Sequence, residues 1–170
     1  MTYKKTLRLF VCAIALAALA IPGLAQGERG KATLKAGSGS ITVDYGRPSL
    51  QGRDPLAMLN PGSYWRMGKD EATTLNTPVD LMFGATKIAK GSYTLRLFKS
   101  SADAYEIAFT PQGGQSADSA KEAIKAAMKK ATAPSSVEIF TIDLKEAPGG
   151  GTFFLTWGTA QLTADFKISK

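Results

Sequence analysis

The side chains best suited to chemistry gather in one stretch of this 170-residue chain, between positions 41 and 75. Aromatic rings offer flat surfaces to the apolar faces of sugars, and arginines and carboxylates offer paired hydrogen bonds to hydroxyl or anionic groups. The side chains expected to line a ligand-binding site are Tyr45, Arg47, Arg53, Tyr64, Trp65, Arg66 and Glu71. The cluster predicts a shallow binding site, and we assign no catalytic residue to it.

A structural role for the same residues is the alternative. Arg66 and Glu71 lie on either side of Gly68, a spacing that suits two short strands joined by a tight turn, across which these two side chains would face each other. An arginine matches a carboxylate through two parallel hydrogen bonds, and an aromatic ring can stack on the guanidinium. In this interpretation the cluster clamps the loop of residues 51–63 to the sheet, and the sequence leaves both interpretations open.

Catalysis by carboxylates is a further alternative. Cleavage of a glycosidic bond needs two carboxylates about 5 to 10 Å apart. The candidates are Asp44, Asp70 and Glu71. Asp70 and Glu71 are adjacent, so on an extended segment they would point to opposite faces. A hydrolase acting on glycans therefore stays the second hypothesis, behind a domain that binds without turnover.

The composition excludes several kinds of site. The chain has no histidine, and its one cysteine, Cys12, lies among the first 25 residues. Without these side chains there is no Ser-His-Asp or Cys-His catalytic system and no ordinary zinc, copper or haem site. Asp80, Asp103 and Asp143 lack the spacing of a calcium-binding loop. We predict no cofactor and no bound metal.

The first 25 residues have the pattern of a secretory signal peptide. Lys4, Lys5 and Arg8 precede an apolar run over residues 9–21, and small residues follow up to Ala25. We predict cleavage after Ala25, no membrane-spanning segment afterwards, and export to the periplasm or beyond. Removal of three cations lowers the formal net charge from +7 to +4, which is too small an excess to predict nucleic-acid binding.

Most of the remaining chain alternates apolar and polar residues, as strands do. Residues 26–39 are expected to be a flexible lead-in that could contain a first strand at 31–35, and residues 40–170 a single β-rich domain. The alternating segments are residues 41–45, 73–76, 79–83, 93–97, 105–109, 140–144, 153–157 and 162–168. Their number and spacing predict a mainly β fold, an antiparallel β-sandwich or flattened barrel of about eight strands. In this pattern Trp157 is expected in the core.

One segment, residues 118–131, repeats its apolar residues at helical intervals. Ser119 and Glu122 are spaced as a capping box, Lys129 and Lys130 are basic at the other end, and Pro134 follows. The pattern predicts one amphipathic helix between strands.

The cluster also carries a resemblance to a known family. A Tyr-x-Arg-Pro strand end and a Gly-Arg pair, followed by Trp-Arg-x-Gly-x-x-Glu-Ala-Thr, resemble the bacterial family called domain of unknown function 2911. The matching positions are Tyr45, Arg47, Pro48, Gly52, Arg53, Trp65, Arg66, Gly68, Glu71, Ala72 and Thr73. The similarity extends through residues 90–95, while the chain departs from the family after Phe109 and has Asp70 where we expect Asn. The resemblance implies an exported, strand-rich single domain and supplies no activity.

Together these observations favour an exported, non-catalytic β-sandwich domain that binds a small molecule, a glycan or an envelope protein. The alternatives are the carboxylate-dependent hydrolase and a purely structural envelope protein that associates through sheet edges.

Overall fold

The computed structural model describes residues 28–112 and 123–169, and all of its named elements are strands. The ten strands are β1 (Arg29–Ala36), β2 (Gly39–Gly46), β3 (Tyr64–Trp65), β4 (Thr73–Thr77), β5 (Leu81–Phe83), β6 (Thr86–Ile88), β7 (Gly91–Lys99), β8 (Tyr105–Pro111), β9 (Ile124–Ala147) and β10 (Gly150–Ile168). The predicted mainly β class is confirmed, with ten strands in place of about eight. The described residues contain no helix that is long and apolar enough to cross a membrane.

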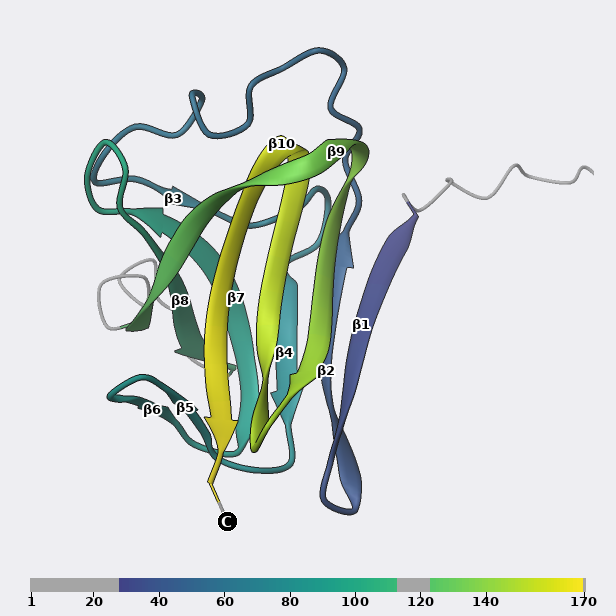
Figure 1. The fold of residues 1–170 in the computed structure, drawn as a ribbon, viewed down its shortest axis with the longest axis vertical. Coiled ribbons are helices and arrows are strands. Elements are labelled where there is room, and N and C mark those ends of the chain that lie inside the picture. Colours follow the sequence, from purple (N-terminus) through teal and green to yellow (C-terminus); the bar gives the residue numbers. More distant parts are fainter. Residues whose placement is uncertain (1–27, 113–122, 170) are drawn as a thin grey trace, which may run out of the picture.

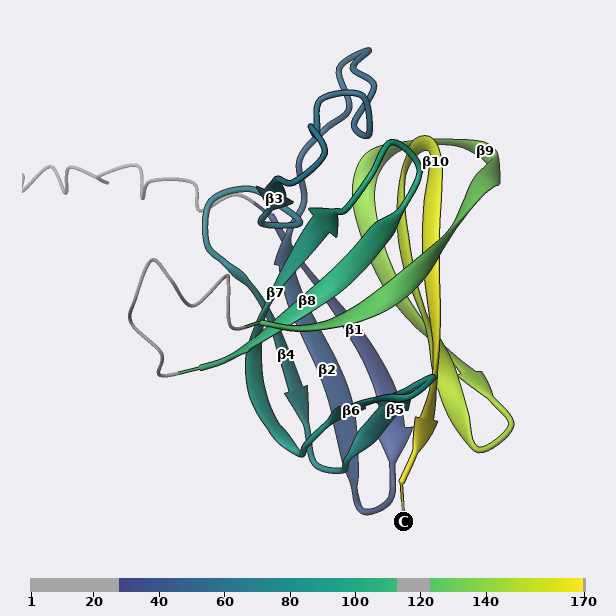
Figure 2. The same ribbon diagram turned by 90° about the vertical axis from the view of Figure 1, so that its left-hand side faces the viewer.

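All strands belong to one antiparallel sheet, in the order β1-β2-β4-β7-β8-β9-β10-β5-β6, with β3 also paired to β7. The two ends of this order, β1 and β6, are not paired with each other, so the sheet is open and the closed form of the predicted barrel is wrong. The sheet folds over on itself because β9 pairs with β8 at its beginning and with β10 along most of its length. Figure 2 shows β9 passing from the side of β7 and β8 to the side of β10.

The core lies between the two halves of the folded sheet. In β2 the alternate residues Ile41, Val43 and Tyr45 are buried, as their period of two predicts. Rings from distant strands meet there: the centroids of Phe83 and Phe109 lie 5.2 Å apart. Burial of one face of each strand supplies the main stabilisation of this cysteine-free region.

The described part of the predicted helix is a strand. Residues 124–131 are part of β9, and Ala126 pairs with Ile107 of β8. Only Ala126 and Met128 are buried in this stretch, at a period of two. Alanine favours helices, but the edge of β8 has backbone N–H and C=O groups that need partners and β9 supplies them, so tertiary pairing overrides local propensity. The expected helix start, residues 118–122, lies outside the described residues.

The ordered part of the domain begins before residue 40. β1 covers the expected strand at residues 31–35 and pairs with β2 along its whole length, from Arg29 opposite Gly46 to Ala36 opposite Gly39. The expected signal peptide, residues 1–25, lies outside the described residues, and export stays a prediction.

The chain that follows β2 crosses to the other half of the sheet, as Figure 1 shows above β2 and β9. Ser49 forms a β-bridge with Ile139 of β9. The backbone N–H of Leu50 donates to the carbonyl of Glu138 at 2.7 Å, and the N–H of Phe140 donates to the carbonyl of Pro48 at 2.9 Å. These bonds fix the start of the loop that carries the candidate site.

Candidate functional site

The segment predicted as a hairpin is an interrupted strand. β3 and β4 both pair with β7, where Trp65 lies opposite Leu97 and Thr73 lies opposite Leu95. Residues 66–72, called here the inserted loop, therefore project from the sheet between two nearly adjacent pairing positions. β3 and β4 do not pair with each other, so the predicted turn geometry is wrong.

The inserted loop packs backbone to backbone against the end of β2. Met67 is fully buried although its φ is 56°, and the Thr73 hydroxyl donates a hydrogen bond to its carbonyl at 2.7 Å. A Cβ added at Gly46 would lie 2.1 Å from the carbonyl oxygen of Lys69, and one at Gly68 would lie 2.8 Å from the carbonyl oxygen of Gly46. The two motifs that carry the family resemblance thus contact each other, and two of their glycines make the contact sterically feasible.

A second segment, the long loop of residues 51–63, covers the same end of the sheet. Its side chains Leu56 and Leu59 are buried. The Lys99 ammonium, itself buried, donates to the carbonyl of Leu56 at 3.3 Å, and the N–H of Gly62 donates to the carbonyl of Lys99 at 2.7 Å. Lys99 follows the inward positions of β7 at a period of two, and a lysine on a buried strand face was the signal that could have revealed this anchor.

The other end of the long loop is held by Glu138 of β9. Its carboxylate accepts hydrogen bonds from the Ser49 hydroxyl and from the N–H of Gln51. These hydrogen bonds hold the pKa of Glu138 below its ordinary value, and the bond from Ser49 has the largest effect. The loop is therefore clamped to the sheet, but by Lys99 and Glu138, which lie outside the predicted cluster.

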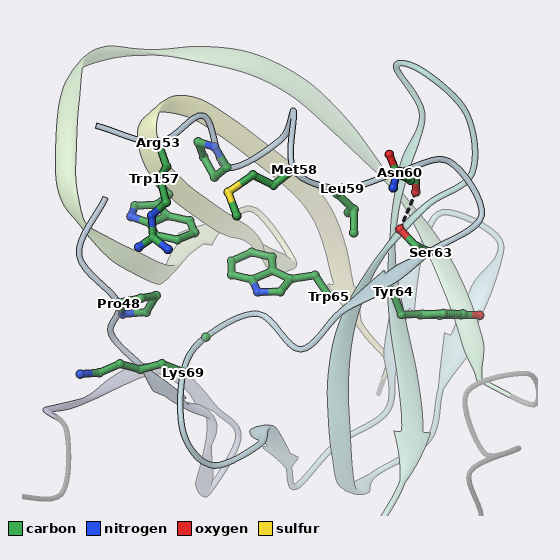
Figure 3. Close-up of a pocket in the computed structure, with 12 residues that line it drawn as sticks. Pro48, Arg53, Met58, Leu59, Asn60, Ser63, Tyr64, Trp65, Lys69 and Trp157 are labelled. Atoms are coloured by element: carbon green, nitrogen blue, oxygen red, sulfur yellow. Dashed lines mark hydrogen bonds between the residues drawn. The ribbon is translucent and has the colours of Figure 1, made fainter. Parts of the chain in front are cut away.

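A pocket of about 430 Å³ lies between the long loop, the inserted loop and the sheet (Figure 3). Its lining combines aromatic and aliphatic side chains with two cations and a few neutral polar groups. The lining residues are Pro48, Arg53, Pro55, Met58, Leu59, Asn60, Ser63, Tyr64, Trp65, Gly68, Lys69 and Trp157.

Two tryptophans form the aromatic part of the lining. The rings of Trp65 and Trp157 are nearly parallel, at 11°, with centroids 5.6 Å apart. Phe140 meets both of them edge to face, with centroids 5.1 Å from Trp65 and 5.8 Å from Trp157. Trp157 is buried as predicted and lines the pocket as well, a role that its strand pattern did not indicate.

Arg53 lies over the Trp157 ring, with its guanidinium carbon 5.5 Å from the ring centroid. Its Nε donates to the carbonyl of Leu50 at 3.0 Å and its Nη2 donates to the carbonyl of Ser49 at 2.7 Å. Two backbone acceptors and one aromatic face therefore fix the plane of the guanidinium before any ligand binds.

Three of the seven predicted site residues line the pocket, namely Arg53, Tyr64 and Trp65. The ring of Tyr64 points away from the pocket in Figure 3 and packs on Phe98, with centroids 4.6 Å apart. Adjacent strand residues face opposite sides, so Trp65 and Tyr64 cannot both present their rings to one ligand.

The other four predicted residues make contacts elsewhere. Tyr45 is buried and donates to the carbonyl of Ile142, and Arg47 forms an ion pair with Glu28. Arg66 donates through Nη1 to the carbonyl of Asp70 at 2.9 Å. Glu71 has an oxygen 3.8 Å from Arg29 Nη1.

The carboxylates considered for catalysis lie outside the pocket lining. Asp44 accepts a hydrogen bond from Arg29, so Asp44 and Glu71 contact the same guanidinium. Asp70 lies beside Lys69, with 3.9 Å between the nearest charged atoms. Within residues 28–112 and 123–169 no group of three or more carboxylates could hold a metal ion.

Comparison with known proteins finds a family match. A family model described as "Protein of unknown function (DUF2911)" matches residues 28–166. No curated protein matches the chain, and no solved structure does.

Proposed function

We propose that this chain, which belongs to the DUF2911 family of proteins of unknown function, is a ligand-binding domain whose site is the pocket between the long loop and the inserted loop. The match over residues 28–166 confirms the resemblance inferred from the motifs. The two halves of the sheet pack on each other as in a sandwich and provide a rigid base for the two loops. With the predicted signal peptide, this domain would act in the periplasm or outside the cell.

The observation that carries the proposal is the pairing of Trp65 and Trp157 in one pocket. A volume of about 430 Å³ is within the usual range for small-molecule sites. Such sites are mainly apolar with a few convergent polar groups, which describes this lining. Trp157 itself is buried in the core and still contributes to this lining.

The ligand that fits this lining is a small molecule with a flat ring, a sugar or an aromatic compound. Indole faces bind the apolar face of a pyranose and the face of an aromatic ring. Met58 is 63% exposed at the pocket and can adapt to either ring, because its side chain is unbranched and polarisable.

Binding without turnover is better supported than hydrolysis. The pocket lining includes no Asp or Glu, and hydrolysis of a glycosidic bond requires two carboxylates at the bond. The carboxylates considered for hydrolysis, Asp44, Asp70 and Glu71, are absent from the lining, and Asp44 and Glu71 both contact Arg29.

Intrinsic fluorescence tests the proposal directly, because the chain has only two tryptophans and both line the pocket. Titration of the purified protein with simple pyranoses and benzene derivatives should give a saturable change in emission. Trp65→Ala should weaken the response, which Trp157 still reports. Phe98→Ala, which removes a ring on the opposite side of the sheet, serves as the matched control and should bind like the parent. A response that does not saturate would overturn the proposal. Equal ligand affinity in the Trp65→Ala and Phe98→Ala variants would overturn it as well.

A further inference from the structure

The charges of the pocket have one sign. Arg53 and Lys69 line it, and no carboxylate does. The proposed function leaves open which ring compound binds, and this charge distribution narrows the choice. Two cations in a lining without carboxylates, beside an apolar surface, favour a ligand that brings a negative charge.

Arg53 is prepared to receive an anion. Its Nε and Nη2 are oriented by the carbonyls of Leu50 and Ser49, while Nη1 has no acceptor in the described part of the chain. No described carboxylate forms an ion pair with Arg53. The nearby Glu138 carboxylate is engaged by Ser49 and Gln51. The guanidinium thus keeps free donors in a fixed plane.

Lys69 supplies the second charge from a loop whose backbone is held in place. Its backbone is held by the close packing of the inserted loop on Gly46. The nearest described carboxylate to its ammonium is that of Asp70, 3.9 Å away and on the adjacent residue. Pairs of this kind at the surface are weak, so Lys69 stays available to a ligand.

In the view of Figure 3 the two cations lie on the same side of the pocket. Figure 3 shows the Arg53 guanidinium and the Lys69 ammonium on the side of Pro48, while Met58 and Trp65 lie further along the cavity. A ligand that fits this arrangement has a charged end and a flat apolar body.

We infer that the pocket selects a ring compound bearing a carboxylate, which Arg53 and Lys69 hold while the ring lies against Trp65 and Met58. This inference rests on the proposed function. The planar fork of an arginine matches the two oxygens of a carboxylate, and a lysine adds a point charge. Two sources share this chemistry, a sugar acid and an aromatic acid.

Two matched pairs of probes test the inference, glucuronate against glucose and benzoate against benzamide. The acid of at least one pair should bind about tenfold or more tightly than its neutral partner, because hydrogen bonds to charged groups are the stronger ones. The pair that responds identifies the source. Arg53→Lys should remove most of this preference by losing the fork, and Lys69→Met should weaken the acid roughly two- to fivefold. Lys35→Met, an exposed lysine on β1, is the matched control and should change nothing.

The outcomes separate the two proposals. Equal affinity for the acid and the neutral member in both pairs overturns the inference and leaves the proposed function standing. The same follows if Lys69→Met, verified as folded by its melting curve, binds the acid as tightly as the parent does. If the tryptophan fluorescence responds to none of the four compounds, both the inference and the proposed function are overturned.

Discussion

The Tyr45→Phe variant tests whether Tyr45, one of the predicted site residues, has a structural role or a binding role. Tyr45 extends from β2 across the core, and its hydroxyl donates to the carbonyl of Ile142 at 3.1 Å, 97 residues away in the chain. In the β9–β10 hairpin Ile142 lies opposite Leu155, at a pair whose backbone groups point away from β10. The tyrosine hydroxyl is therefore the partner of a buried carbonyl at an open strand edge.

The expected loss follows from that geometry. Phenylalanine keeps the edge-to-face contact with Phe140, whose centroid lies 5.7 Å from that of Tyr45, so packing is preserved. What is lost is one buried hydrogen bond, and the Ile142 carbonyl remains desolvated, at a cost of about 1–3 kcal/mol. For a domain of this size the melting temperature should fall by roughly 3–9 °C.

Urea unfolding followed by tryptophan fluorescence measures the effect. Tyr93→Phe is the matched control, because its hydroxyl donates locally to the exposed Ala89 at 2.7 Å and water can replace it, at a cost below about 1 kcal/mol. A Tyr45→Phe protein that unfolds at the parental urea concentration refutes the reasoning. Parental stability together with weakened ligand binding would place Tyr45 in the site after all.

Two further changes test the packing around the pocket. Gly46→Ala should destabilise the protein by more than about 3 kcal/mol in urea unfolding, because its Cβ would lie 2.1 Å from the carbonyl oxygen of Lys69. Gly84→Ala is the control: its φ is 59° and the space around it is open, so it should cost about 1–2 kcal/mol. Similar losses in the two variants would contradict the backbone contact at Gly46. The pKa of Glu138 is held below its ordinary value of 4.5, first by the Ser49 hydroxyl, so its carboxylate stabilises the fold fully above pH 4.5 and less as the pH falls through the lowered value. The difference in melting temperature between the parent and Glu138→Ala should therefore be constant near neutral pH and shrink in acid, and a difference independent of pH would count against this role.

The strands with strict alternation could be predicted because each buries one face. Ile41, Val43 and Tyr45 point into the core as their spacing indicates, and the same spacing already argued against Tyr45 as a surface residue. The segment of residues 124–131 could not be predicted, because the edge of β8 decides its conformation and no local pattern encodes that edge.

The site was predictable only in its local part. Arg53 and Trp65 belong to a cluster that is visible as a run of unusual residues, and both line the pocket. Trp157, Lys99 and Glu138 come from strands that the topology brings to the same end of the sheet. Their role depends on strand order, which single-sequence periodicity does not supply.

The place of the β5–β6 hairpin determines when the chain can finish folding. The hairpin is made between β4 and β7 but joins the sheet through Leu81 and Met82, which pair with Ile168 and Lys167 at the end of β10. The buried Leu81 gains this strand partner only when that end arrives. A nascent or truncated chain that lacks Lys167 and Ile168 therefore holds an early-made hairpin without its partner, and the last residues complete the native state.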